Sequence, residues 1–165
     1  MDLGGNTGTY SLEVASVVDQ VVCVDIDPVA INRLYHRLRG SSVVNVLPLI
    51  GNLLDPTPSS GWNLKERRSL LVRLQSDAFL ALALVHHLCI GGNVPIPQVV
   101  EVLHGLAPAG VVEWVDKSDP MVQKMLRNRS DVFVDYTWEC FRLEVEKVFK
   151  IVAIDYGIKK NILRY

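Results

Sequence analysis

Short, continuously apolar runs alternate along the chain with longer stretches in which apolar residues recur every three or four positions. The short runs, such as residues 21–25, are rich in valine and are typical of strands covered on both faces of a parallel sheet. The longer stretches, such as residues 28–38, place Ile31, Leu34 and Leu38 on one face and predict amphipathic helices. The order of these segments predicts an α/β domain with a mostly parallel sheet and helices on both faces.

The same pattern sets the expected boundaries of the elements. A Pro-, Ser- and Gly-rich stretch at residues 55–61 predicts a loop. No internal repeat and no shift in composition divides the chain, so we expect a single domain over residues 1–165. We predict strands at residues 21–25, 43–50, 78–85, 110–115, 150–154 and 161–165, and helices at 28–38, 64–74, 97–106, 121–127 and 137–148.

Composition narrows the function classes. The 165 residues are 49% hydrophobic and carry 17 basic and 18 acidic side chains, so bulk charge gives no strong signal for nucleic acid. The longest apolar run, residues 78–90, is shorter than the roughly 20 residues of a membrane span, and no secretory leader is visible. Cys23, Cys89 and Cys140 are far apart in apolar settings, as expected for reduced core thiols. We therefore expect a cytoplasmic protein with no membrane partner.

A glycine-rich turn stands at the start of the chain. Gly4, Gly5 and Gly8 follow Asp2-Leu3, and Asp25 ends the next predicted strand. Glycines let the backbone approach a ligand closely, and an acid at a strand end can accept hydrogen bonds from both ribose hydroxyls. Together they predict a nucleoside site. The turn does not fit the G-x-G-x-x-G dinucleotide fingerprint, so a nicotinamide-dependent oxidoreductase stands only as an alternative.

The sequence Asp2-Leu3-Gly4-Gly5-Asn6-Thr7-Gly8 resembles the first motif of class I S-adenosylmethionine-dependent methyltransferases, with Asn6 at the middle glycine. Residues 22–27, 51–52 and 77–88 look like the second, third and fourth motifs of that family. Residues 55–62, 66–69, 80–93 and 131–137 resemble its nodulation-protein-like branch, so the likeness covers essentially the whole chain.

This resemblance implies a Rossmann-like fold, S-adenosylmethionine as the cofactor, and transfer of its methyl group to an acceptor. In the family the first strand is preceded by further elements, so the likeness implies a domain incomplete at its N-terminus, with the first strand largely missing. An exposed sheet edge beside it would favour self-association. The implied cofactor-binding residues are Asp2, Gly4, Gly5, Asn6, Gly8, Asp25, Ile26 and Asn52; Asp25 would hold the ribose and Asn52 the adenine edge.

Methyl transfer from a sulfonium is a direct in-line displacement, so the enzyme acts mainly by alignment. A base helps only where the acceptor must lose a proton, and His86 or His87 are the candidates, with Glu113 a weaker one. Adjacent side chains diverge and no ligand spacing surrounds the two histidines, so we predict no metal site. The sequence does not indicate whether the methyl acceptor is a small molecule or a macromolecule.

Several residues keep two interpretations. Arg67, Arg68 and Arg73 would contact an anionic substrate or form the solvated face of the predicted helix at residues 64–74. Trp62 and Trp114 would stack on a substrate ring or pack in the core. A non-catalytic remnant or interaction module remains the second alternative to a methyltransferase.

Overall fold

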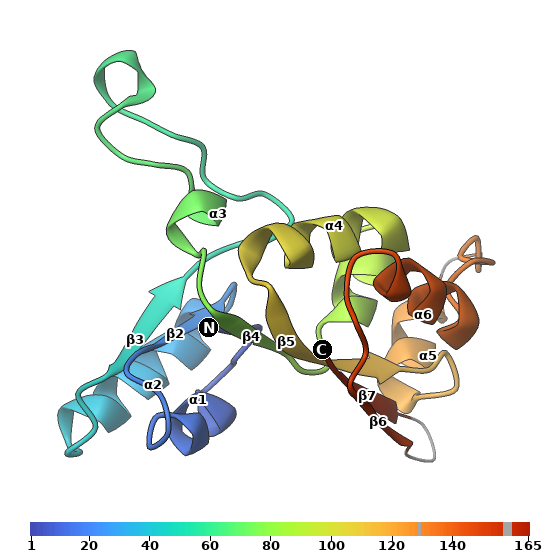
Figure 1. Ribbon diagram of the computed structural model, residues 1–165, viewed down its shortest axis with the longest axis horizontal. Coiled ribbons are helices and arrows are strands. Elements are labelled where there is room, and N and C mark those ends of the chain that lie inside the picture. The colour runs from blue at the N-terminus through green and yellow to red at the C-terminus, as the bar shows by residue number, and fades with distance from the viewer. Residues whose placement is uncertain (129, 157–159) are drawn as a thin grey trace. The chain divides into compact units, whose positions relative to one another are not determined.

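The computed structural model describes residues 1–128, 130–156 and 160–165. They form two compact units, Met1–Leu80 and Ala81–Tyr165 (Figure 1). None of the helices in these ranges is both long enough and apolar enough to cross a membrane.

The first unit is built on parallel strands. β1 is only two residues long and pairs with β2 on one side and with Leu80 of β4 on the other. The strand order is β3-β2-β1-β4, so the carboxyl ends of β1, β2 and β3 share one edge. The strands are β1 (Asp2–Leu3), β2 (Val21–Asp25), β3 (Val46–Ile50) and β4 (Ala78–Ala81).

Helices α1 (Thr9–Val14) and α2 (Pro28–Arg39) follow β1 and β2. α2 begins where Asp27 accepts a hydrogen bond from the Val29 amide and proline occupies the first turn, and it ends at Gly40. Its buried face, centred on Leu34, packs with Cys23 of β2 in the core. The strand predicted at residues 21–25 and the helix predicted at 28–38 are therefore confirmed.

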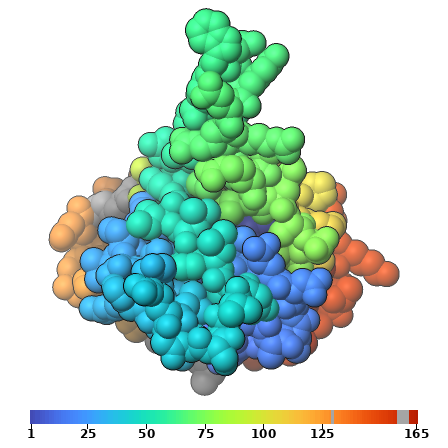
Figure 2. Space-filling model, turned by 90° about the vertical axis from the view of Figure 1, so that its left-hand side faces the viewer, coloured from blue at the N-terminus to red at the C-terminus, as the bar shows by residue number. Residues whose placement is uncertain are grey.

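An extended segment, residues 51–69, projects from the strands of the first unit; we name it the arm (Figures 1 and 2). The helix predicted at residues 64–74 is wrong. Ser60 and Arg67 pair through two backbone hydrogen bonds of 2.9 and 3.1 Å, and Asn63 and Leu64 have left-handed φ angles of 54° and 57°. These angles stop a helix, and only η1 (Trp62–Leu64) and the short α3 (Leu70–Arg73) form.

The arm changes the interpretation of the basic residues and of Trp62. Arg67 and Arg68 are exposed on the arm, whereas Arg73 lies in α3 and donates from Nε to the Arg68 carbonyl. The indole of Trp62 is 86% exposed, so it does not pack in the core.

The second unit contains helices and an antiparallel group of strands in the order β5-β7-β6. The helices predicted at 97–106, 121–127 and 137–148 and the strand at 110–115 are confirmed to within a few residues. The elements are η2 (His87–Gly91), α4 (Ile96–Leu106), β5 (Ala109–Val115), α5 (Pro120–Leu126), α6 (Trp138–Glu146), β6 (Ala153–Tyr156) and β7 (Lys160–Arg164).

The strand predicted at residues 78–85 is shorter than expected. β4 ends at Ala81, and Ala83 then takes a left-handed φ of 50°. A strand cannot continue through that conformation, so Val85 and His86 leave the extended path despite their apolar neighbours.

Aromatic side chains form the centre of the second unit. Trp114 is 1% exposed, and its ring stacks on Tyr136 and on Phe141, with centroid distances of 4.2 and 4.9 Å. Of the two interpretations of Trp114, packing in the core is therefore the correct one.

Candidate functional site

The turn after β1, residues 4–8, is the first part of the site; we name it the glycine turn. The amides of Gly4 and Gly5 both donate to the Val24 carbonyl, at 2.8 and 3.1 Å, and the Gly8 amide donates to the Gly5 carbonyl. Gly4 and Gly8 have φ angles of 71° and 76°, which residues with a side chain rarely adopt. The glycine turn is therefore held against β2 by its own backbone.

Two of these glycines are also required by space. A Cβ at Gly5 would lie 2.5 Å from the Cys23 sulfur, and one at Gly8 would lie 2.6 Å from Leu34 Cδ1. Both distances are far below van der Waals contact. The turn therefore packs directly on the core between β2 and α2.

Asn6 replaces a glycine of the family motif without changing this path. Its φ is 50°, the left-handed conformation that asparagine tolerates better than most residues. Its amide donates to Asp25 Oδ2 at 2.8 Å, which ties the glycine turn to the end of β2.

The carboxylate of Asp25 is held in one orientation at this edge of the sheet by two hydrogen bonds. Its Oδ2 accepts from the Asn6 amide and its Oδ1 accepts from the Asp27 amide, both at 2.8 Å. The side chain is half-buried at the end of β2. A carboxylate has about four acceptor directions, so two such bonds leave acceptor capacity for a pair of hydroxyls.

Asp2 lies inside the unit. It is 2% exposed, and its Oδ2 accepts a 2.6 Å hydrogen bond from the Ser11 hydroxyl of α1. Burial raises the pKa of the Asp2 carboxyl above its usual value of 3.8. Through this hydrogen bond Asp2 holds the first turn of α1 in place. Sequence reasoning missed Ser11, because a serine in an apolar helix gives no signal of a buried partner.

Ile26 and Asn52 lie at the same edge. Ile26 is 60% exposed directly after Asp25. The Gly51 amide donates to the Asp25 carbonyl at 2.9 Å, and Asn52 Oδ1 accepts from the Leu54 amide. The structure therefore brings Asp25, Ile26 and Asn52 together beside the glycine turn, as the motif order predicts.

The candidate bases belong to the second unit. His86 is 2% exposed, whereas His87 is exposed at the start of η2. Their ring centroids are 4.2 Å apart, so the expectation that the two side chains diverge is wrong. Glu113 is half-buried in β5, two residues before the strand ends.

Among the described residues, no three His, Cys, Asp or Glu side chains form a group that could hold a metal ion. The three cysteines are free thiols, and Cys23 and Cys89 are buried while Cys140 is half-buried. Burial raises the pKa of Cys23 to about 11 and that of Cys89 to about 12. These two thiols therefore stay protonated and unreactive near neutral pH.

The second unit also contains a cavity of about 550 Å³ that sequence reasoning missed. Its lining comes from three separate parts of the chain, residues 89–97, 132–136 and 140–144. Two of these parts overlap segments that resemble the nodulation-protein-like branch, but that resemblance does not indicate a cavity. Only folding brings them together.

Solved structures identify the fold. A SAM-dependent methyltransferase from Aquifex aeolicus superposes with a TM-score of 0.61 and 16% identity, covering 99% of this chain and 78% of its own. WbdD, a bifunctional kinase-methyltransferase, gives 0.65 and 16% over 98% of this chain and 34% of its own. The fold is therefore the Rossmann-like α/β fold of S-adenosylmethionine-dependent methyltransferases, as predicted.

The sequence itself is similar to one curated protein. It is 38% identical over 153 residues to the nodulation protein NoeA of Rhizobium meliloti (strain 1021), which covers 92% of this chain and 32% of NoeA. The chain therefore spans about a third of the length of this relative. No model of a known protein family matches it. The predicted resemblance to the nodulation-protein-like branch is confirmed.

Proposed function

We propose that this chain binds S-adenosylmethionine and contributes the cofactor site of a methyltransferase. The observation that carries the proposal is the Asp25 carboxylate, which receives the Asn6 amide of the glycine turn and the Asp27 amide at the end of β2. The methyltransferase fold and the similarity to NoeA support the same activity.

The residues present fit the nucleoside part of this cofactor. Asp25 retains acceptor capacity for the two ribose hydroxyls. Exposed Ile26 offers an apolar surface for the adenine face, and Asn52 offers an amide for its edge. Asp2 acts indirectly, because its buried carboxylate holds Ser11. When bound, the cofactor supplies an activated methyl group on a sulfonium.

His87, His86 and Glu113 are proposed to handle the proton of the acceptor. A neutral imidazole nitrogen can accept a proton, and His87 is the more accessible of the two. A buried His86 would instead position its neighbour, since their rings lie 4.2 Å apart.

The test is calorimetric titration of S-adenosylhomocysteine into the wild-type chain and into Asp25→Ala. We expect binding by the wild type and an affinity loss of at least about tenfold in the variant, because hydrogen bonds to a charged group are lost. Asp19→Ala removes an exposed charge of the same unit and serves as the control.

Circular dichroism establishes that each variant is folded. Titration with NADH tests the oxidoreductase alternative directly. Binding of NADH in preference to S-adenosylhomocysteine, or binding of neither by the folded wild type, overturns the proposal; the second result favours a non-catalytic module.

A further inference from the structure

The cavity of the second unit has a volume of about 550 Å³, which lies within the usual range for small-molecule sites, roughly 300–1,000 Å³. All of its lining residues belong to residues 81–165, whereas the proposed cofactor-binding residues belong to residues 1–80.

One wall is rigid and apolar. Pro95 and Pro97 flank Ile96 at the start of α4, and a proline ring fixes the backbone φ at each position. Cys89 of η2 is 4% exposed, and burial raises the pKa of its thiol to about 12, so it presents a neutral surface. This wall would contact an apolar group.

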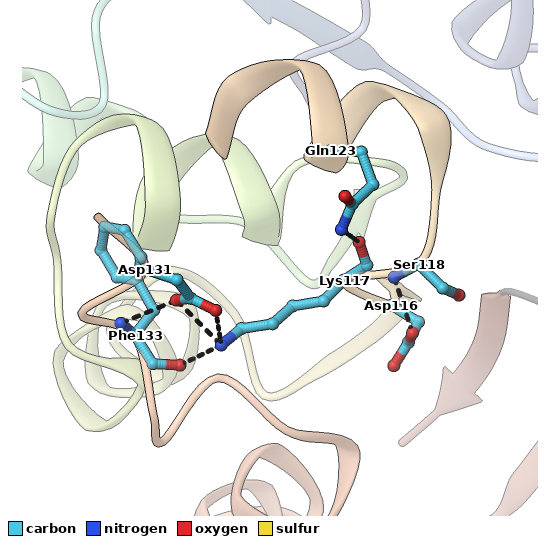
Figure 3. A network of polar contacts seen from close by, with 6 residues as sticks. All are labelled: Asp116, Lys117, Ser118, Gln123, Asp131 and Phe133. Atoms are coloured by element: carbon cyan, nitrogen blue, oxygen red, sulfur yellow. Dashed lines mark hydrogen bonds and ion pairs between the residues drawn. The ribbon is translucent and has the colours of Figure 1, made fainter. Parts of the chain in front are cut away.

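Another part of the lining comes from residues 131–136, which form a loop; we name this loop the wall segment. Lys117 Nζ donates to both oxygens of Asp131, at 3.0 and 2.9 Å, and to the Phe133 carbonyl at 2.6 Å (Figure 3). Gln123 in turn donates to the Lys117 carbonyl. The positive charge of Lys117 is therefore paired within the protein, with the carboxylate of Asp131.

Tyr136 fixes the other end of the wall segment. Its hydroxyl donates to the Val115 carbonyl at 2.8 Å, and its ring stacks on Trp114. With both ends held, a ligand would meet a preformed wall and lose little free energy in ordering it.

The charged side chains that line the cavity have one sign. The charged side chains among its lining residues are Asp135 and Glu144, and both are acidic. Glu144 accepts from Lys147 Nζ at 2.6 Å, but the lysine side chain is 63% exposed, so this pair is readily exchanged. A cation would be attracted, and an anion would be repelled.

We propose that this cavity binds a small amine with an apolar or aromatic body, the body between Ile96, Phe133 and Tyr136 and the ammonium group at Asp135 and Glu144. Apolar burial supplies the affinity and the two carboxylates supply the selectivity. The tyrosine and phenylalanine rings add attraction for a cation close to their faces.

Three probes of equal length test the proposal: 4-phenylbutylamine, 4-phenylbutan-1-ol and 4-phenylbutyrate, titrated into the full chain by calorimetry. We expect the amine to bind at least about tenfold more tightly than the carboxylate. The Asp135→Asn/Glu144→Gln variant should bring the three affinities close together, whereas Glu139→Gln, at an exposed position of α6, should leave the order unchanged.

A second variant tests occupancy of the cavity without touching the core. Val132 is 67% exposed and lines the cavity, so Val132→Trp should weaken all three probes. Asp25→Ala should change none of them, which separates this site from the proposed cofactor site. Absence of probe binding, or binding without preference for the amine, overturns the proposal.

Discussion

The glycine turn of the first unit and the wall segment of the second are both loops beside a strand end, but they are held by different means. The glycine turn is fixed by backbone hydrogen bonds and by the lack of room for any Cβ at Gly5 and Gly8. The wall segment is fixed by side-chain contacts: Lys117, from outside the segment, bonds to it, and its own Tyr136 bonds to Val115 and stacks in the core. A single substitution of a glycine should therefore disrupt a loop like the glycine turn. A loop like the wall segment should become more mobile when the side chain that holds it is removed.

The largest effect is expected for Gly8→Val. A β-branched residue at a φ of 76°, with its Cβ 2.6 Å from Leu34 Cδ1, combines backbone strain with overpacking. Together these should cost about 2–5 kcal/mol of the free energy of unfolding, measured by urea denaturation. Gly40→Ala is the control, because its Cβ would lie in ordinary contact, 3.9 Å from the Arg37 carbonyl oxygen. Equal stability of the two variants would contradict the role of Gly8.

A smaller and more local effect is expected for Lys117→Met. The variant keeps the aliphatic stem and removes the donor to Asp131 and Phe133. Amide hydrogen exchange should become faster within residues 131–136 and stay unchanged in the glycine turn. Lys124→Met, at an exposed position of α5, is the matched control. Unchanged exchange in the wall segment would show that Tyr136 alone holds it.

The smallest effect concerns pH and the first unit. Burial raises the folded-state pKa of Asp2 above 3.8, so its favourable contribution is fully present below about 3.8 and is lost as the pH rises through the raised folded pKa. Relative to Asp2→Asn, the wild type should therefore lose stability over that interval, by at most about 1.4 kcal/mol per pH unit.

Denaturation curves of both proteins between pH 3 and 8 would measure this difference, with Asp55→Asn as the exposed control. A stability difference between wild type and Asp2→Asn that stays constant across the range would show that the pKa of the buried Asp2 carboxyl is not raised.

The contrast between the two loops also explains what the sequence predicts. The strand at residues 21–25, the helix at 28–38 and the glycine turn depend on neighbours in sequence: an apolar run, a capping Asp27 and glycines at positive φ. Such signals are local and therefore readable. They located Asp25 and Asn52, whose cofactor roles remain predictions.

Non-local features were not readable. The helix expected at residues 64–74 is replaced by the arm, because the Ser60–Arg67 pairing competes with a weak helical pattern. β4 ends just before Ala83, which takes a left-handed conformation that an alanine in the sequence does not predict. The cavity depends on Lys117 reaching 14 and 16 residues along the chain. None of these three features carries a recognisable pattern in the local sequence.

The exposed indole of the arm gives the molecule a built-in optical label. Trp62 is 86% exposed, whereas Trp114 is 1% exposed within the aromatic stack of the second unit. Water relaxes around an exposed indole and shifts its emission to the red, and dissolved quenchers reach it first. The third tryptophan, Trp138, is half-buried in α6. A fluorescence spectrum recorded with and without iodide, with Trp62→Phe as the reference, therefore isolates the signal of the arm.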